Sequence, residues 1–239
     1  MAPIPTPSPE PTWPIPRLDL RIDDLAHPGV AVFLDAVNPL TALRDAVTAS
    51  FKWLYTQETV PTHVHTLLLV LRSMPGVAHA TGTLHHKELH FSLDYIKKSE
   101  HPRVRDEIMG VLTHETVHCF QYDAKGSCPG GLIEGVADYV RLRANLAPPH
   151  WRRHPGGTWD AGYETTGYFL HWLEERYGDG TVQELNAKLD GVQYDERIFK
   201  RTTGRPVMKL WRIYCAELEE RNAEPPQVQA EYLQLPLGD

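Results

Sequence analysis

Cysteine is scarce in this chain of 239 residues, with Cys119, Cys128 and Cys215 as the only three. A small and odd number of cysteines argues against a disulfide framework. No Asn-x-Ser/Thr acceptor for N-glycosylation occurs, and the first residues lack the basic and apolar stretches of a signal peptide. These absences favour an intracellular, cytoplasmic protein.

Long apolar runs and an excess of basic residues are also missing. The longest apolar run covers residues 67–71, whereas a membrane-spanning helix needs ~20 residues. Lys and Arg number 24 against 31 Asp and Glu, which gives a net charge of −7 and a pI near 6.0. A mildly acidic chain without a basic patch is a poor candidate for binding nucleic acid or an anionic membrane. We therefore expect neither as a partner.

The remaining composition is that of a globular protein, with 41% hydrophobic and 23% charged residues. The length suits one large domain, or one domain with tails. Seven prolines fall within the first 16 residues, a density that favours an extended or disordered arm. We predict an arm over residues 1–17, a domain over 18–223 and a loose tail over 224–239.

Apolar periodicity predicts strands first and helices afterwards, apart from one early helix. The expected strands cover residues 18–25, 30–37, 64–72, 77–84 and 88–96. The expected helices cover residues 39–57, 103–122, 132–144, 162–177, 181–189 and 206–221. This order indicates the α+β class.

Residues 114–118 have the sequence His-Glu-Thr-Val-His. On a helix, positions i and i+4 share a face, so His114 and His118 can reach one metal ion with Glu115 beside it as a general base. The alternative is a helix that carries two histidines by chance. Cys119 follows directly, and we interpret it as a packing residue.

Glu134 and Asp138 stand one turn apart on the next expected helix, among apolar residues. A catalytic zinc site with two His and one Glu leaves a fourth position open for water. It also uses a carboxylate that accepts the free ring N–H of a ligating His. Spacing alone leaves open which carboxylate has which role, and Asp123 is a third candidate ligand. We choose Glu134 as ligand, because the absent side chain of Gly135 would let the metal helix approach and because the Glu-x-x-x-Asp order is similar to that of zincins whose third ligand is Glu. Asp138 would then accept the free ring N–H of a ligating histidine.

Residues 110–144 include HETVHCFQYDAKGSCPGGLIEGVADYVRLRA. This block resembles the basic secretory protein family of plants, fungi and bacteria in three patterns: H-E-x-x-H-x-x-Q, P-G-G-L-I-E-G and A-D-Y-V-R. The resemblance continues more loosely through residues 159–163 and 169–173, and covers about residues 20–220. It implies a zincin fold and a zinc metallopeptidase. The chain departs from the family name in being acidic, and the family makes secretion an alternative localisation.

The resemblance also implies roles for two further segments. The strand expected over residues 88–96 would be the sheet edge that pairs with an extended substrate peptide. Tyr163, in a Gly-Tyr segment at the start of a helix, could donate a hydrogen bond to the oxyanion of the reaction. The alternative for Tyr163 is an aromatic residue of the core.

Together these features predict hydrolysis of peptide or protein substrates with Zn²⁺ as cofactor. His114, His118 and Glu134 would hold the metal, and Glu115 would be the general base. Two alternatives stay open. The chain could hydrolyse a small non-peptide amide, or it could be a non-catalytic, defence-related binding protein on the same fold.

Overall fold

The computed structural model of the chain describes residues 12–99 and 102–223. It combines helices with a mixed four-stranded sheet, which confirms the predicted α+β class. The chain divides into two compact units, of which one ends at Phe120 and the other begins at Gln121. The single domain over 18–223 and the zincin assignment stay predictions. The predicted tail and residues 1–11 of the predicted arm lie outside the described residues.

The sheet belongs to the first unit and has the order β1-β2-β4-β3. Neighbours β1/β2 and β2/β4 run parallel, whereas β3 and β4 run antiparallel. The strands are β1 (Arg17–Ile22), β2 (Thr66–Arg72), β3 (Ala78–Gly82) and β4 (His86–Ser92). The carboxyl ends of β1, β2 and β4 therefore lie at the same end of the sheet, because parallel strands share their direction.

One face of the sheet forms the core of this unit. Leu67, Leu69 and Leu71 of β2 are fully buried on it, and Leu89 and Phe91 of β4 continue the same face. Alternate positions point to the opposite face because side chains alternate along a strand.

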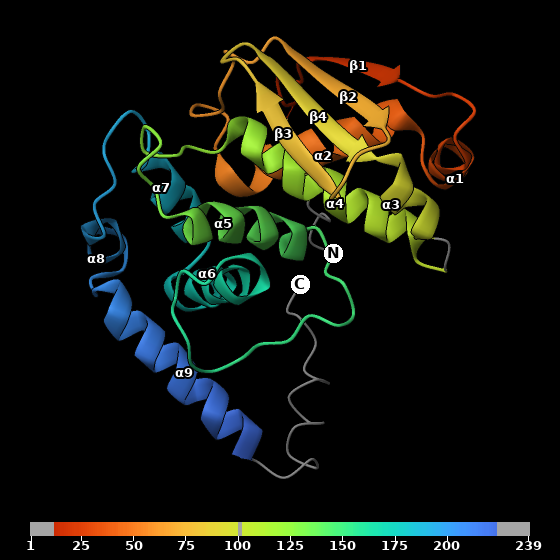
Figure 1. The fold of residues 1–239 in the computed structure, drawn as a ribbon. Coiled ribbons are helices and arrows are strands. Elements are labelled where there is room, and N and C mark those ends of the chain that lie inside the picture. The colour runs from red at the N-terminus through yellow and green to blue at the C-terminus, as the bar shows by residue number, and fades with distance from the viewer. Residues whose placement is uncertain (1–11, 100–101, 224–239) are drawn as a thin grey trace, which may run out of the picture. The chain divides into compact units, whose positions relative to one another are not determined.

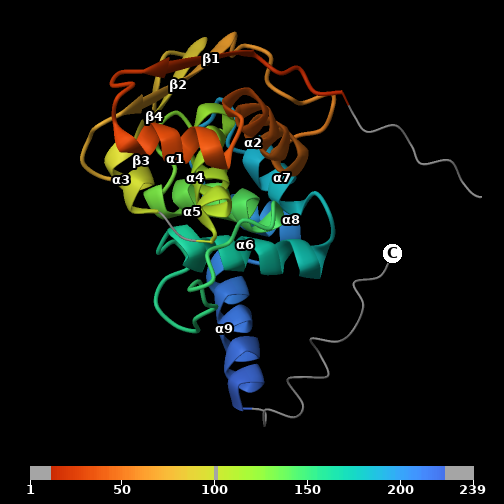
Figure 2. The same cartoon turned by 90° about the vertical axis from the view of Figure 1, so that its right-hand side faces the viewer.

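The helices of the first unit are α1 (Pro28–Ala36), α2 (Pro39–Leu54), α3 (Leu93–Lys98) and α4 (Val104–Phe120). Helix α2 packs against α4, and α1 packs against α3. Both views show α2 and α4 on the same side of the sheet (Figure 1, Figure 2). Trp13, ahead of β1, packs its ring 5.9 Å from that of Phe51 in α2.

The strand predicted over residues 30–37 is wrong, since this segment is helix α1. The run of Val and Phe residues suggested a strand. However, the side chain of His27 caps the helix by accepting from the Gly29 N–H, and proline follows at the first helical position. Val30, Phe33 and Val37 then lie on one buried helical face. Local capping and helical spacing outweigh β propensity here.

The predicted strand over residues 88–96 is wrong in its extent and in its position. Strand β4 ends at Ser92, whose side chain accepts from the Tyr95 N–H and so caps α3. Strand β4 also pairs on both sides, with β2 and with β3. It is therefore an inner strand, and β3 is the edge next to it.

The second unit is helical in its described part. Its helices are α5 (Gly130–Arg143), α6 (Tyr163–Tyr177), α7 (Thr181–Ala187), α8 (Arg197–Thr203) and α9 (Val207–Ala223). The sequence did not predict α8. The core of the second unit contains rings of α6 and α9: the ring centroid of Phe169 lies 5.3 Å from that of Trp211 and 5.7 Å from that of Tyr214.

Candidate functional site

Helix α4 carries the histidine motif, and its last residue is anchored within the first unit. The ring of Phe120 packs edge-on against Phe51, with centroids 4.7 Å apart. The buried Tyr55 hydroxyl donates to the backbone carbonyl of Phe120. The carbonyls of a last helical turn lack partners within the helix. Tyr55 therefore fixes the end of α4, two residues beyond the motif.

The structure brings the two motif histidines together. The Nε2 atoms of His114 and His118 lie 3.1 Å apart, and their rings are nearly perpendicular at 83°. His114 is only 9% exposed, and His118 is half-buried. Two neutral imidazoles can make such a contact only if one nitrogen donates a proton to the other. The alternative is that both lone pairs face a shared cation.

Glu115 lies between these histidines in sequence and is half-buried. Cys119, one turn further on, has its thiol 3.7 Å from the Glu115 carbonyl oxygen. Burial raises the pKa of Cys119 to about 12. The thiol thus stays protonated and does not serve as a nucleophile, which agrees with its interpretation as a packing residue.

Helix α5 of the second unit carries the two carboxylates. Asp138 is only 2% exposed, whereas Glu134 is half-buried. A carboxylate as deeply buried as Asp138 is costly unless it has partners, which argues against a solvated helix face. Among the described residues, one group of three could hold a metal ion: His114, His118 and Glu134, with their ligand atoms all within 4.8 Å of one another.

The role that was predicted for Gly135 in the choice of Glu134 as ligand is wrong. Gly135 does not serve to admit the metal helix, because a Cβ built there would collide with the Thr166 side chain of α6. The Thr166 hydroxyl in turn donates to the Trp159 carbonyl at 2.8 Å and accepts from the Gly162 N–H at 2.9 Å. Gly135 thus allows α5 and α6 to approach closely, and this pairing sets the orientation of α5.

Tyr163 begins α6 and is 56% exposed. The alternative that it is a core aromatic is therefore wrong, while its role as an oxyanion donor stays a prediction. Its backbone has φ of 46°, a left-handed conformation that is uncommon for a residue other than glycine. Gly162 precedes it with φ of 92°. A side chain added at Gly162 would come within 3.8 Å of the Glu134 Cβ, so the turn before Tyr163 lies beside Glu134.

The third candidate ligand, Asp123, is exposed, and its backbone carbonyl accepts from the Cys128 N–H at 3.1 Å. The neighbouring Tyr122 N–H donates to the Asn186 side chain at 3.1 Å. Sequence reasoning missed the supporting residues Tyr55, Asn186 and Thr166. The first two act over 64 or 65 positions in sequence, so no local spacing could have indicated them.

The described helices contain none that is both long and apolar enough to cross a membrane.

A mixed sheet beside a helix that presents paired histidines and a glutamate is an arrangement suited to a hydrolase. Residues 15–214 match a family model described as a peptidase of plants and bacteria. The match covers more than half of the chain, so the chain belongs to this family, BSP. This confirms the resemblance found in the sequence. Searches of curated proteins and of solved structures find no match.

Proposed function

We propose that the chain is a zinc-dependent peptidase. The observation that carries this proposal is the pair of Nε2 atoms on α4, 3.1 Å apart, with Glu115 next to His114. Membership of a family described as a peptidase supports the substrate class, which is peptides.

The donor set fits zinc. Two imidazole ligands at 2.0–2.1 Å from a tetrahedral ion have their nitrogens about 3.3 Å apart. The observed 3.1 Å between His114 and His118 is close to this value. Glu134 adds a carboxylate oxygen within 4.8 Å of one ring nitrogen of each histidine. Two His and one Glu form a donor set used by catalytic zinc, with a fourth position left open.

Each residue then has a defined task. Zinc, when bound, polarises the scissile carbonyl and lowers the pKa of a water molecule. Glu115 accepts the proton of the attacking water and delivers it to the leaving amine. Asp138 accepts the free ring N–H of a ligating histidine and so holds its orientation. The Tyr163 hydroxyl donates a hydrogen bond to the developing oxyanion.

Metal content tests the proposal. Protein purified without chelator should carry about one zinc per chain by elemental analysis, because the three ligands define a single site. Chelation should abolish cleavage of a peptide library, and stoichiometric zinc should restore it. Finding no transition metal in folded protein, or cleavage that survives chelation, would refute the proposal.

A further inference from the structure

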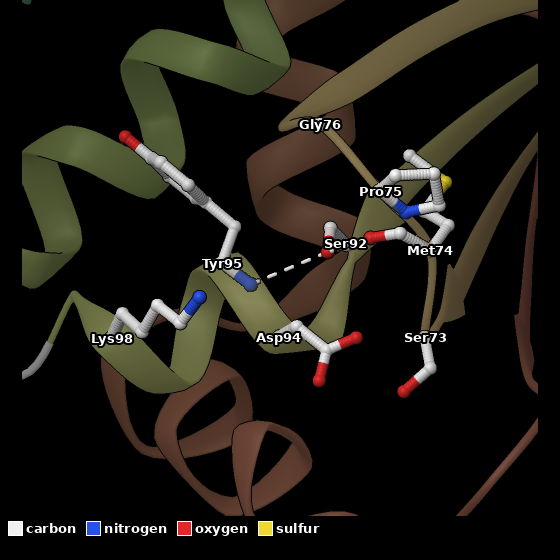
Figure 3. A pocket seen from close by; sticks show the side chains of 8 residues that line it. All are labelled: Ser73, Met74, Pro75, Gly76, Ser92, Asp94, Tyr95 and Lys98. Carbon is white, nitrogen blue, oxygen red and sulfur yellow. Dashed lines mark hydrogen bonds between the residues drawn. The ribbon is translucent and has the colours of Figure 1, made fainter.

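The three parallel strands of the first unit have their carboxyl ends together at one end of the sheet, at Ile22, Arg72 and Ser92. In open sheets with parallel strands, ligands bind beyond the carboxyl ends of the strands. A cavity of about 520 Å³ lies at this end of the sheet (Figure 3). Its lining comes from the segments after β2 and β4: Ser73, Met74, Pro75, Gly76, Ser92, Asp94, Tyr95 and Lys98.

Asp94 gives the cavity a negative charge at neutral pH. A hydrogen bond with the Ser73 hydroxyl is the main cause that lowers the pKa of this carboxyl below its usual value. His27 contributes next, with Nε2 at 3.4 Å from the Asp94 carboxylate. Because Nδ1 of His27 accepts from the Gly29 N–H, the proton of the neutral ring is on Nε2. A neutral His27 ring thus places an N–H, and no second charge, beside Asp94.

Lys98 gives the cavity a positive charge at a separate place. It stands one turn after Asp94 on α3, yet among the described residues Asp94 pairs within 4.0 Å with His27 rather than with Lys98. Figure 3 shows the Asp94 carboxylate on the side of Ser73 and the Lys98 amine on the side of Tyr95. The two charges are thus set apart within one cavity.

The other polar groups of the lining already have partners within the protein. The Ser92 hydroxyl donates to the Met74 carbonyl at 2.8 Å, and the Tyr95 hydroxyl donates to Glu107 at 2.7 Å. Met74 and Pro75 add an apolar wall. A ligand would therefore meet one anion, one cation and an apolar surface.

We propose that this cavity binds a small zwitterion with an apolar side chain, of the size of a dipeptide. The ligand ammonium pairs with Asp94, the ligand carboxylate with Lys98, and its side chain contacts Met74 and Pro75. An extended dipeptide is about 7 Å long, which suits two charges held apart. The proposal uses no residue of the histidine motif and does not depend on whether the chain cleaves peptides.

The test is a titration of the full, isotope-labelled chain with Gly-Leu, followed by backbone amide chemical shifts. Two further probes each lack one charge: N-acetyl-Gly-Leu and Gly-Leu amide. Gly-Leu should shift the amides of Ser73, Asp94 and Lys98. Each capped probe should bind about 1.5- to fivefold more weakly, as expected for the loss of one partly exposed ion pair. The Glu115→Gln chain should give the same result, which separates this proposal from the peptidase proposal.

Two substitutions assign the charges. Lys98→Gln should abolish the preference for Gly-Leu over its amide and keep the preference over the acetylated probe. Asp94→Asn should do the reverse. Lys97→Gln on the same helix and Asp35→Asn on α1 are the matched controls, since neither lines the cavity.

Equal affinity of all three probes for the unmodified chain would overturn the proposal. Shifts confined to residues outside the cavity, no binding at millimolar concentration, or pocket variants that behave as the controls do would also overturn it. If Asp94→Asn fails to fold, Lys98→Gln and the capped probes still decide the outcome.

Discussion

Glu115 is the residue on which the catalytic part of the proposal depends, because a purely structural metal site has no use for it. Glu115→Gln removes the base but none of the three proposed ligands. We expect zinc to stay bound and kcat to fall by ~10²–10⁴, the usual contribution of general acid–base catalysis. Peptide cleavage and zinc content of the same preparation measure both effects.

Glu58→Gln is a suitable control for this experiment, since Glu58 is exposed and outside the motif. It should leave both zinc content and kcat unchanged. A Glu115→Gln chain that cleaves at the unmodified rate would contradict the assigned role of Glu115.

Glu134 and Asp138 should respond differently to substitution, although they stand one turn apart on α5. Glu134→Ala removes a proposed ligand and should lose zinc almost completely. Asp138→Ala removes a partner of a ligand and should weaken zinc binding by roughly 10–100-fold. A competition titration with a zinc indicator measures both affinities.

The burial of Asp138 requires a check of folding, so a thermal melt of the metal-free variant should accompany the titration. The reverse order of affinities would exchange the two roles. Negligible losses in both variants would direct attention to Asp123.

The individual residues of the candidate site were predicted from the sequence better than the bounds of the elements or the order of the sheet. The spacing of His114 and His118 indicated that their rings share a helix face, and the structure places their Nε2 atoms 3.1 Å apart. Spacing could not predict what lies opposite Gly135, because Thr166 reaches it from a helix 31 positions later. It also could not decide between a core and an exposed position for Tyr163, since that depends on the turn at Gly162.

Among the elements, the pairing of α5 with α6 depends on close backbone approach. Gly135→Ala should destabilise the protein by about 1–3 kcal/mol, the usual cost of overpacking a tight contact, because the added methyl group meets Thr166. Gly130→Ala at the start of the same helix is the matched control, since a Cβ there meets no atom within 4 Å. Thermal or urea unfolding of both variants measures the difference. Equal stability of the two would show that α5 and α6 can separate without cost.

Helices with regular apolar spacing were predicted well, and short elements were not. The segment of α2 and the segment of α4 were both expected as helices within a few residues of their observed bounds. By contrast, α1 was expected as a strand, α3 as the end of a strand, and α8 was missed. In α1 and α3 a capping side chain, His27 or Ser92, decides the conformation. A single cap is a weaker signal in a sequence than several turns of apolar periodicity.

For the whole molecule, the net charge of −7 makes a simple prediction. At pH 7.5, above the pI near 6.0, the chain should bind an anion exchanger and pass through heparin at low salt. This follows because carboxylates outnumber basic groups and the sequence lacks a basic patch. Retention on heparin that falls with added salt would contradict it.

The fold class could be predicted from the order of strands and helices, and the family from residues 110–144. The sheet order could not, because nothing in the local pattern of β4 shows that β2 and β3 flank it on both sides. Pairing partners are chosen by contacts distant in sequence. The division of the chain at Phe120 was not predicted either.

Strand β3 bears on how the protein behaves at high concentration. Sheet edges are templates on which other chains can assemble into aggregates. This strand is only five residues long, and its last residue, Gly82, has φ of 114° in a tight turn towards His86. An incoming chain would find few consecutive backbone groups with which to pair. On the β3 side the sheet thus ends in a segment that discourages fibril growth.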